Sequence, residues 1–176
     1  MPLIKKIKEN NCHIGIWEMS ESLDKLIKLS NTTTIPKLNS KIRKKHFLST
    51  RLLLEKLHPN ASIKYNKYGA PEIEKNLFIS ISHSNNLAAI IISKKKVGLD
   101  IEKVSEKPLK ISSKFIAKNT SEELTKEKAT IIWSCKEAIF KWHQKGGVSF
   151  SKDIQIMPFE IKKKGEIIAK FKDQLY

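Results

Sequence analysis

ISISHSNNLAAIIISKKKVGLDIEK, residues 79–103, contains the pattern that most directly indicates the fold class. Residues 77–84 place successive side chains on two alternating faces, which predicts a β-strand. LAAIIIS, residues 87–93, has no polar face, so we expect a strand that is covered on both sides. VGLDIE, residues 97–102, is interpreted as a further strand, with Asp100 and Glu102 on the same face.

Strands and helices also alternate outside this stretch. In the first part of the chain, the patterns predict two strands within residues 3–19, a helix after Ser20 with Leu23, Leu26 and Ile27 on one face, and a helix over about residues 39–57. A turn is expected on Gly69 and Pro71. Residues 108–145 are predicted to be mainly helical with a break near 119–121, and strands are predicted on either side of the turn at 162–165. The order strand, helix, strand recurs in each half, which indicates a mixed α and β protein.

The chain has 176 residues, enough for one domain or for two small halves that share a core. Its longest strongly apolar run, residues 87–92, is far shorter than the ~20 residues that span a bilayer. We therefore expect a cytoplasmic protein. Cys12 and Cys135 lie far apart without Cys or His partners at metal-ligand spacing, so neither a disulfide framework nor a zinc site is indicated.

A formal net charge of +16 indicates an anionic partner, which could be nucleic acid, a membrane surface, a polyphosphate ligand or an acidic protein. Aromatic residues make up only 7% of the chain, and no strand carries closely spaced aromatic and basic residues that would stack on bases. This weakens the nucleic-acid interpretation. A solvated lysine-rich surface is the ordinary alternative.

The two acids of GLDIE would stand side by side, because residues i and i+2 of a strand share a face about 7 Å apart. Two such carboxylates repel each other unless a cation lies between them. Mg²⁺ suits oxygen ligands of this kind and commonly bridges carboxylates to a substrate phosphate. Gly98 would leave room for a ligand on that face. A plain solvent-facing pair is the alternative.

A helix is predicted over IIWSCKEAIFKWHQKGG, residues 131–147. One apolar stripe is expected at helical spacing: Ile131, Cys135, Ala138, Ile139 and Trp142. A second row, at i, i+4 and i+8, contains Trp133, Glu137 and Lys141. The acid and the base could be an ordinary helix pair. Alternatively, Glu137 would complete a Mg²⁺ cluster and Lys141 would meet a phosphate.

Taken together, three motifs resemble the signature of the 4′-phosphopantetheinyl transferases, specifically the monomeric Sfp type. These are SHS at residues 82–84, GLDIE at 98–102 and WSCKEAIFK at 133–141, and their order, spacing and identities all agree. The resemblance covers roughly residues 38–150. It implies an α+β fold in which two similar α/β halves, residues 1–95 and 96–176, pack as a pseudo-dimer with the active site between them.

The resemblance also implies functional residues. Asp100, Glu102 and Glu137 would hold Mg²⁺ on the pyrophosphate of coenzyme A, and Lys141 would assist there. The nucleotide phosphates would be contacted by Ser82 and His83, of which His83 could instead be a buried structural histidine. The 3′-phosphate would be bound by Arg51, with Arg43 and Lys44 in the same basic run, and a guanidinium suits that role.

The implied reaction transfers 4′-phosphopantetheine from coenzyme A to a serine of an acyl or peptidyl carrier protein, releasing adenosine 3′,5′-bisphosphate. Glu137 or a metal-bound water would be the general base. We expect a monomer whose partners are coenzyme A and an acidic carrier protein, with no nucleic acid or membrane partner. A Mg²⁺-dependent phosphodiesterase or nuclease, or a basic nucleic-acid-binding module, would be the alternatives.

Two features depart from the family pattern. YGAP, residues 68–71, has Ala70 where family members commonly carry Lys, so Lys67 would serve the coenzyme or the contact would be absent. The chain is also short for the monomeric type. The shortened part is mostly the C-terminal half, which leaves the surface for the carrier protein undefined.

Overall fold

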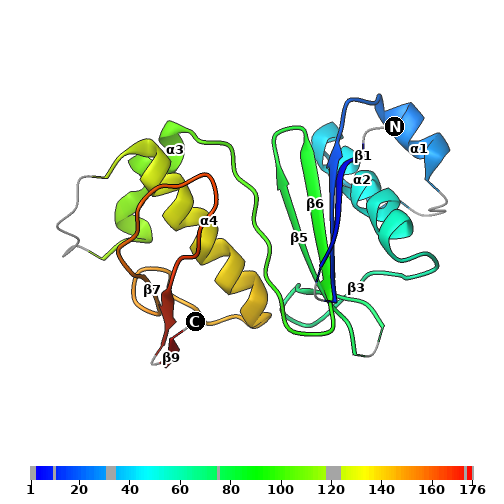
Figure 1. Cartoon of the computed structure of the whole chain (residues 1–176). Coiled ribbons are helices and arrows are strands. Elements are labelled where there is room, and N and C mark those ends of the chain that lie inside the picture. The colour runs from blue at the N-terminus through cyan, green and yellow to red at the C-terminus, as the bar shows by residue number, and fades with distance from the viewer. Residues whose placement is uncertain are drawn as a thin grey trace. The chain divides into compact units, whose positions relative to one another are not determined.

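The computed structural model describes residues 3–9, 11–30, 35–74, 76–117, 124–172 and 174–175. It divides the chain into two compact units, Met1–Ile101 and Glu102–Tyr176. Both units combine helices with strands, so the mixed α and β fold is confirmed (Figure 1). The pseudo-dimeric arrangement and the functional halves expected at residues 1–95 and 96–176 stay predictions.

Unit 1 is built on a four-stranded antiparallel sheet in the order β1-β2-β6-β5. Its elements are β1 (Leu3–Glu9), β2 (Cys12–Glu18), α1 (Leu23–Leu29), α2 (Lys41–Leu57), β3 (Lys64–Tyr65), β4 (Pro71–Glu72), β5 (Phe78–Ser84) and β6 (Leu87–Ser93). Both α1 and α2 lie on one face of the sheet (Figure 1). The strand pair and the long helix predicted from the sequence are confirmed.

The core of unit 1 lies between α2 and the sheet. Its buried apolar residues are Trp17, Met19, Leu26, Leu48, Leu52, Leu53, Leu54, Leu57, Ile79, Ala88, Ile90 and Ile92. Gly15 lets α2 approach β2 closely, because a Cβ atom there would stand 2.7 Å from Cδ1 of the fully buried Leu53. In β6, residues 88–93 are buried on both faces, as the apolar run predicts.

The helix predicted after Ser20 is present as α1. It begins at Leu23 with Ser22 as the N-cap, whose side chain accepts a hydrogen bond from the Lys25 N–H. Leu26 is fully buried, whereas Ile27 is 43% exposed, so the predicted apolar face is buried only in part. The helix is only seven residues long, and its buried stripe is correspondingly narrow.

Residues 97–102 do not form a strand, which corrects the sequence-based prediction. The N–H groups of Leu99 and Ile101 donate instead to the side-chain hydroxyls of Ser80 and Ser82, at 2.9 and 3.2 Å. Both partners advance by two residues, so this segment follows β5 in the same direction. It is not a strand because side-chain hydroxyls, rather than the carbonyls of a neighbouring strand, accept these hydrogen bonds.

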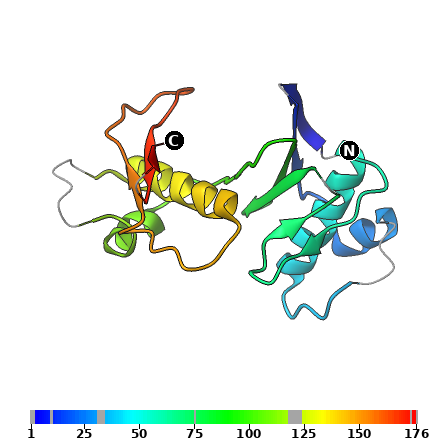
Figure 2. The same ribbon diagram turned by 90° about the horizontal axis from the view of Figure 1, so that it is seen from below.

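Unit 2 contains α3 (Glu106–Lys110), the 3₁₀ turn η1 (Ser112–Lys114), α4 (Lys126–His143) and a three-stranded antiparallel sheet. Its strands are β7 (Ile154–Ile156), β8 (Ala169–Phe171) and β9 (Gln174–Leu175), and β7 packs beside α4 (Figure 2). Strands flank the turn at residues 162–165, as expected. The break predicted near residues 119–121 lies outside the described residues.

The buried face of α4 is not the predicted apolar stripe. Its buried residues are Ala129, Thr130, Ile132 and Lys136, whereas the five residues of the expected stripe are only half-buried. Unit 2 buries Phe115, Ile154 and Phe171 as well. The spacing of apolar side chains alone does not indicate the buried face, because a lysine occupies one of the buried positions. Within the described ranges, no helix has the length and apolar character needed to cross a membrane.

Candidate active site

Asp100 lies half-buried on the segment that follows β5. Its Oδ1 accepts a hydrogen bond of 2.8 Å from the hydroxyl of Ser82, and that hydroxyl also accepts from the N–H of Ile101. Ser82 is only 2% exposed. A buried hydroxyl with both roles fixes the direction of the carboxylate. The hydroxyl of Ser82 therefore orients the carboxylate of Asp100. The contact of Ser82 with coenzyme A stays a prediction.

His83 is exposed near the end of β5, so the alternative of a buried structural histidine is wrong. Its ring stacks on that of His46 from α2, with centroids 4.5 Å apart and planes inclined by 17°. Nε2 of His83 lies 3.5 Å from the hydroxyl oxygen of Thr50, also on α2. The sequence analysis missed His46 and Thr50. The only local signal is their i, i+4 spacing, which does not point to β5.

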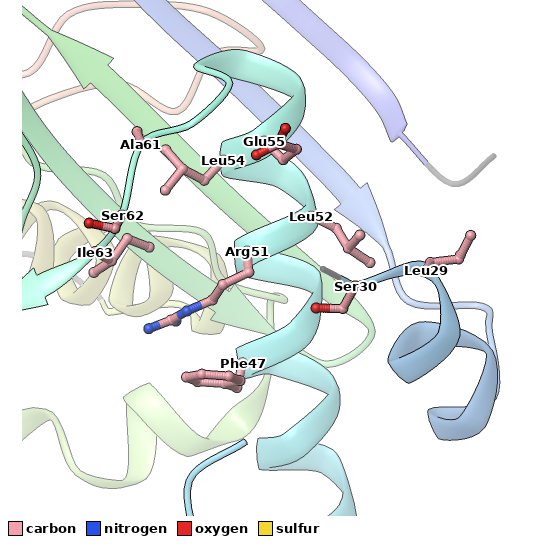
Figure 3. A pocket seen from close by; sticks show the side chains of 10 residues that line it. All are labelled: Leu29, Ser30, Phe47, Arg51, Leu52, Leu54, Glu55, Ala61, Ser62 and Ile63. Carbon is pink, nitrogen blue, oxygen red and sulfur yellow. The ribbon is translucent and has the colours of Figure 1, made fainter. Parts of the chain in front are cut away.

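Arg51 projects from the middle of α2 into an open pocket of about 370 Å³ (Figure 3). Its guanidinium carbon stands 3.8 Å from the centroid of the Phe47 ring, and Nη2 donates to the Tyr65 hydroxyl at 3.4 Å. Aromatic faces on a guanidinium hold the cation without neutralising it. Arg43 is exposed and Lys44 half-buried in the first turn and a half of the same helix. Their contacts with coenzyme A stay predictions.

Glu102 is exposed at the start of unit 2, and its Oε1 accepts a hydrogen bond of 3.1 Å from the indole Nε1 of Trp133. The Trp133 ring packs edgewise on Phe115 and tilted on Phe150, with centroids 5.1 and 5.6 Å away. Trp133 thus packs in an aromatic cluster of unit 2. Its N–H also positions an acid of the proposed site, which the apolar pattern did not indicate.

Glu137 and Lys141 stand one turn apart on α4, and both are half-buried. The lysine next to them, Lys136, is 3% exposed and donates from Nζ to the backbone carbonyls of Phe150, at 2.7 Å, and Ile154. Burial lowers the pKa of Lys136 to about 8. These bonds tie α4 to the segment that carries Phe150, the residue against which Trp133 packs.

The carboxylates have the chemistry that Mg²⁺ requires, because Asp100 and Glu102 each accept a hydrogen bond from a neutral donor that leaves the charge in place. Asp100 belongs to unit 1, whereas Glu102 and Glu137 belong to unit 2. Among the residues that the structure describes, no three His, Cys, Asp or Glu side chains converge as metal ligands. The predicted triad therefore stays a prediction.

The YGAP turn is closed without a charged residue at position 70. The N–H groups of Tyr68 and Ala70 donate to the side-chain oxygen of Asn66, and Gly69 adopts a φ of +80°. Positive φ favours glycine at this position. Lys67 lies with Nζ 5.1 Å from the centroid of the Tyr68 ring. The contact of Lys67 with coenzyme A stays a prediction.

Residues 96–175 match the family model described as the 4′-phosphopantetheinyl transferase superfamily. A curated relative, 4′-phosphopantetheinyl transferase gsp from Aneurinibacillus migulanus, is 32% identical over 97 residues, which are 50% of this chain and 41% of the relative. The chain thus matches less than half the length of this relative. The stretch 96–175 is similar to the 4′-phosphopantetheinyl transferase superfamily, in agreement with the resemblance seen in the motifs.

Proposed function

We propose that the protein transfers 4′-phosphopantetheine from coenzyme A to a serine of an acyl or peptidyl carrier protein. The match over residues 96–175 carries this proposal, because it contains all three carboxylates, Asp100, Glu102 and Glu137, together with Lys141. The name of the relative from Aneurinibacillus migulanus supports the same transfer.

The coenzyme would be bound mainly by the basic groups of unit 1. Arg51 suits the 3′-phosphate, since it is a permanent cation whose aromatic neighbours leave its charge intact. Arg43 and Lys44, on the same helix, would add positive charge around the nucleotide. His83 is exposed and is positioned by α2, so its ring, when it carries a proton on both nitrogens, can donate from Nδ1 to a phosphate oxygen while Nε2 faces Thr50.

In the proposed reaction, the serine hydroxyl attacks the phosphorus that carries the pantetheine group. A new P–O bond forms to serine while the bond to the second phosphate of the pyrophosphate breaks, and adenosine 3′,5′-bisphosphate leaves. Asp100, Glu102 and Glu137 would hold Mg²⁺, which supplies positive charge to the pyrophosphate when bound. Glu137 accepts the serine proton, and Lys141 offers its ammonium to the leaving phosphate.

The positive charge of the chain supports an acidic partner. A formal net charge of +16 attracts both the polyanionic coenzyme and a negatively charged carrier protein. The proposal includes a monomeric enzyme that works in the cytoplasm and does not depend on nucleic acid or a membrane.

The direct test incubates the protein with coenzyme A, Mg²⁺ and a panel of apo carrier proteins and weighs the products by mass spectrometry. We expect one carrier to gain the mass of 4′-phosphopantetheine, with an equal yield of adenosine 3′,5′-bisphosphate. Glu137→Gln should reduce turnover at least about a hundredfold at saturating Mg²⁺. Lys163→Met, an exposed lysine in unit 2, is the matched control and should keep the parental rate.

Two outcomes would contradict the proposal. If no carrier gains mass while nucleic acid is hydrolysed without coenzyme A, the carboxylates serve a phosphodiesterase. If Glu137→Gln and Lys141→Met both keep the parental rate on a carrier that the parent modifies, the α4 row is not catalytic. Calorimetry with 3′-dephospho-coenzyme A tests Arg51 separately, and equal affinity for the two compounds would remove its assignment.

A further inference from the structure

Two stacked histidines, His46 on α2 and His83 near the end of β5, connect these elements of unit 1. His83 is the residue proposed to contact a phosphate of coenzyme A. His46 is half-buried and His83 is exposed, and the two rings lie nearly parallel, 4.5 Å apart. Stacked aromatic rings at this separation restrict each other's rotation. His46 therefore limits the orientations that the exposed ring of His83 can adopt.

His46 itself is held by the turn that joins β5 to β6. Its Nε2 lies 3.3 Å from the carbonyl oxygen of Asn85, which can only accept, so Nε2 of His46 carries a proton. Asn85 adopts a left-handed φ of 51°. The next residue, Asn86, is tied to the end of β2, where its carbonyl accepts from the Met19 N–H and its amide donates to Glu18. These hydrogen bonds hold the turn in place, and the turn fixes the position of the His46 ring.

Thr50 determines which ring nitrogen of His83 carries the proton. Its buried hydroxyl donates to the backbone carbonyl of His46 at 2.5 Å, so its only proton is already used. The hydroxyl oxygen can then only accept from Nε2 of His83, which lies 3.5 Å away. Although 3.5 Å is long for a hydrogen bond, His83 must be the donor, because Thr50 donates its single proton to the carbonyl of His46. This contact favours the tautomer of His83 that carries its proton on Nε2.

We propose that His46, together with Thr50, is a positioning residue that fixes the ring plane and the Nε2–H tautomer of His83. The inference rests on the proposed function, in which His83 contacts a phosphate of coenzyme A. A ring that is already oriented loses less conformational entropy when the ligand binds. His46 thus contributes to coenzyme affinity without touching the coenzyme.

The test combines nitrogen NMR of the histidine rings with calorimetric binding of coenzyme A, using the full-length chain. In the parent, the ring nitrogens of His83 should show the Nε2–H tautomer. His46→Ala should give a mixture of tautomers and weaken coenzyme A binding up to about tenfold. His46→Phe keeps a stacked ring and should restore most of the affinity. His58→Gln, at the other end of α2, is the control and should leave the His83 signals unchanged.

The outcomes separate the inference from the proposed function. Unchanged His83 ring signals in a folded His46→Ala protein would overturn the positioning role, whatever the affinity for coenzyme A. If His46→Ala does not fold, His46→Phe still tests the inference, because loss of affinity equal to that of His83→Ala would overturn the role of the stack. A parent protein that does not bind coenzyme A at all would instead overturn the proposed function.

Discussion

Lys136 belongs to a residue type that is usually exposed, but it is buried in this protein. Lysine is almost never fully buried unless it is paired, yet this side chain is 3% exposed and its ammonium meets two backbone carbonyls. The carbonyls belong to the stretch between α4 and β7 and to the start of β7. Lys136 therefore fastens that stretch to the helix on which Glu137 and Lys141 stand.

The lowered pKa of Lys136 predicts a pH dependence of stability. Burial holds the pKa at about 8 in the folded protein, whereas the unfolded chain has the ordinary value of 10.5. Between these values the unfolded state binds more protons, so the free energy of unfolding rises with pH over this window. The rise attributable to this residue is on the order of 3 kcal/mol. Urea unfolding at several pH values between 7 and 11 would measure it.

The comparison for that experiment is between two lysine variants. Lys136→Met should lack the rise in the free energy of unfolding, because no titratable group remains at the buried position. Lys163→Met removes an exposed lysine from the same unit and should retain it. Parallel curves for the parent and Lys136→Met would show that Lys136 has the same pKa in the folded and unfolded states.

At the scale of elements, the segment at residues 97–101 gains its order from the strand beside it. Ser80 and Ser82, each 2% exposed, accept the N–H groups of Leu99 and Ile101. Ser82 donates to Asp100 in addition. The strand thus supplies side-chain oxygens where a neighbouring strand would supply carbonyls, and in this way it fixes one of the proposed metal ligands.

Hydrogen exchange can test this attachment one amide at a time. Ser80→Ala should accelerate exchange at Leu99, and Ser82→Ala at Ile101, because each change removes the acceptor for that N–H group. Each should also cost about 1–3 kcal/mol of stability, the penalty for a donor left without its partner. Ser20→Ala, at an exposed serine of unit 1, is the control. Equal protection of both amides in the alanine variants would refute the attachment.

At the scale of the whole molecule, the excess of positive charge is the dominant feature. Lys and Arg number 34 against 18 Asp and Glu, and only Arg43 and Arg51 are arginine. Such a charge accelerates encounters with an anionic protein, and salt screens it over about 8–10 Å at physiological ionic strength. The effect acts on association more than on the chemical step.

Salt should therefore reduce the efficiency of transfer without reducing the maximal rate. Raising NaCl from about 50 to about 500 mM should lower kcat/KM for an acidic carrier roughly tenfold or more, while kcat changes little. Steady-state kinetics at saturating coenzyme A would measure both, with circular dichroism as the control for folding. A kcat/KM that does not respond to salt would show that the lysines play no part in recruiting the carrier.

Side-chain periodicity and turn residues were sufficient to predict the elements whose pattern is repetitive and local. The hairpin of β1 and β2, the helix α2, and β6 with its two covered faces all follow from side-chain periodicity and turn residues. The three motifs also indicated a resemblance to the superfamily, and the similarity of residues 96–175 to the family model agrees with it. These features are accessible because each depends on residues close together in the chain.

The contacts between segments that are distant in the chain could not be predicted from the sequence. VGLDIE alternates like a strand, but its backbone donors meet serine hydroxyls of β5, and no periodicity encodes that choice. The stack of His46 on His83 and the burial of Lys136 on carbonyl groups are likewise invisible in a local window. Packing decides such features, because the free energy of a polar side chain depends on the partners that the fold brings to it.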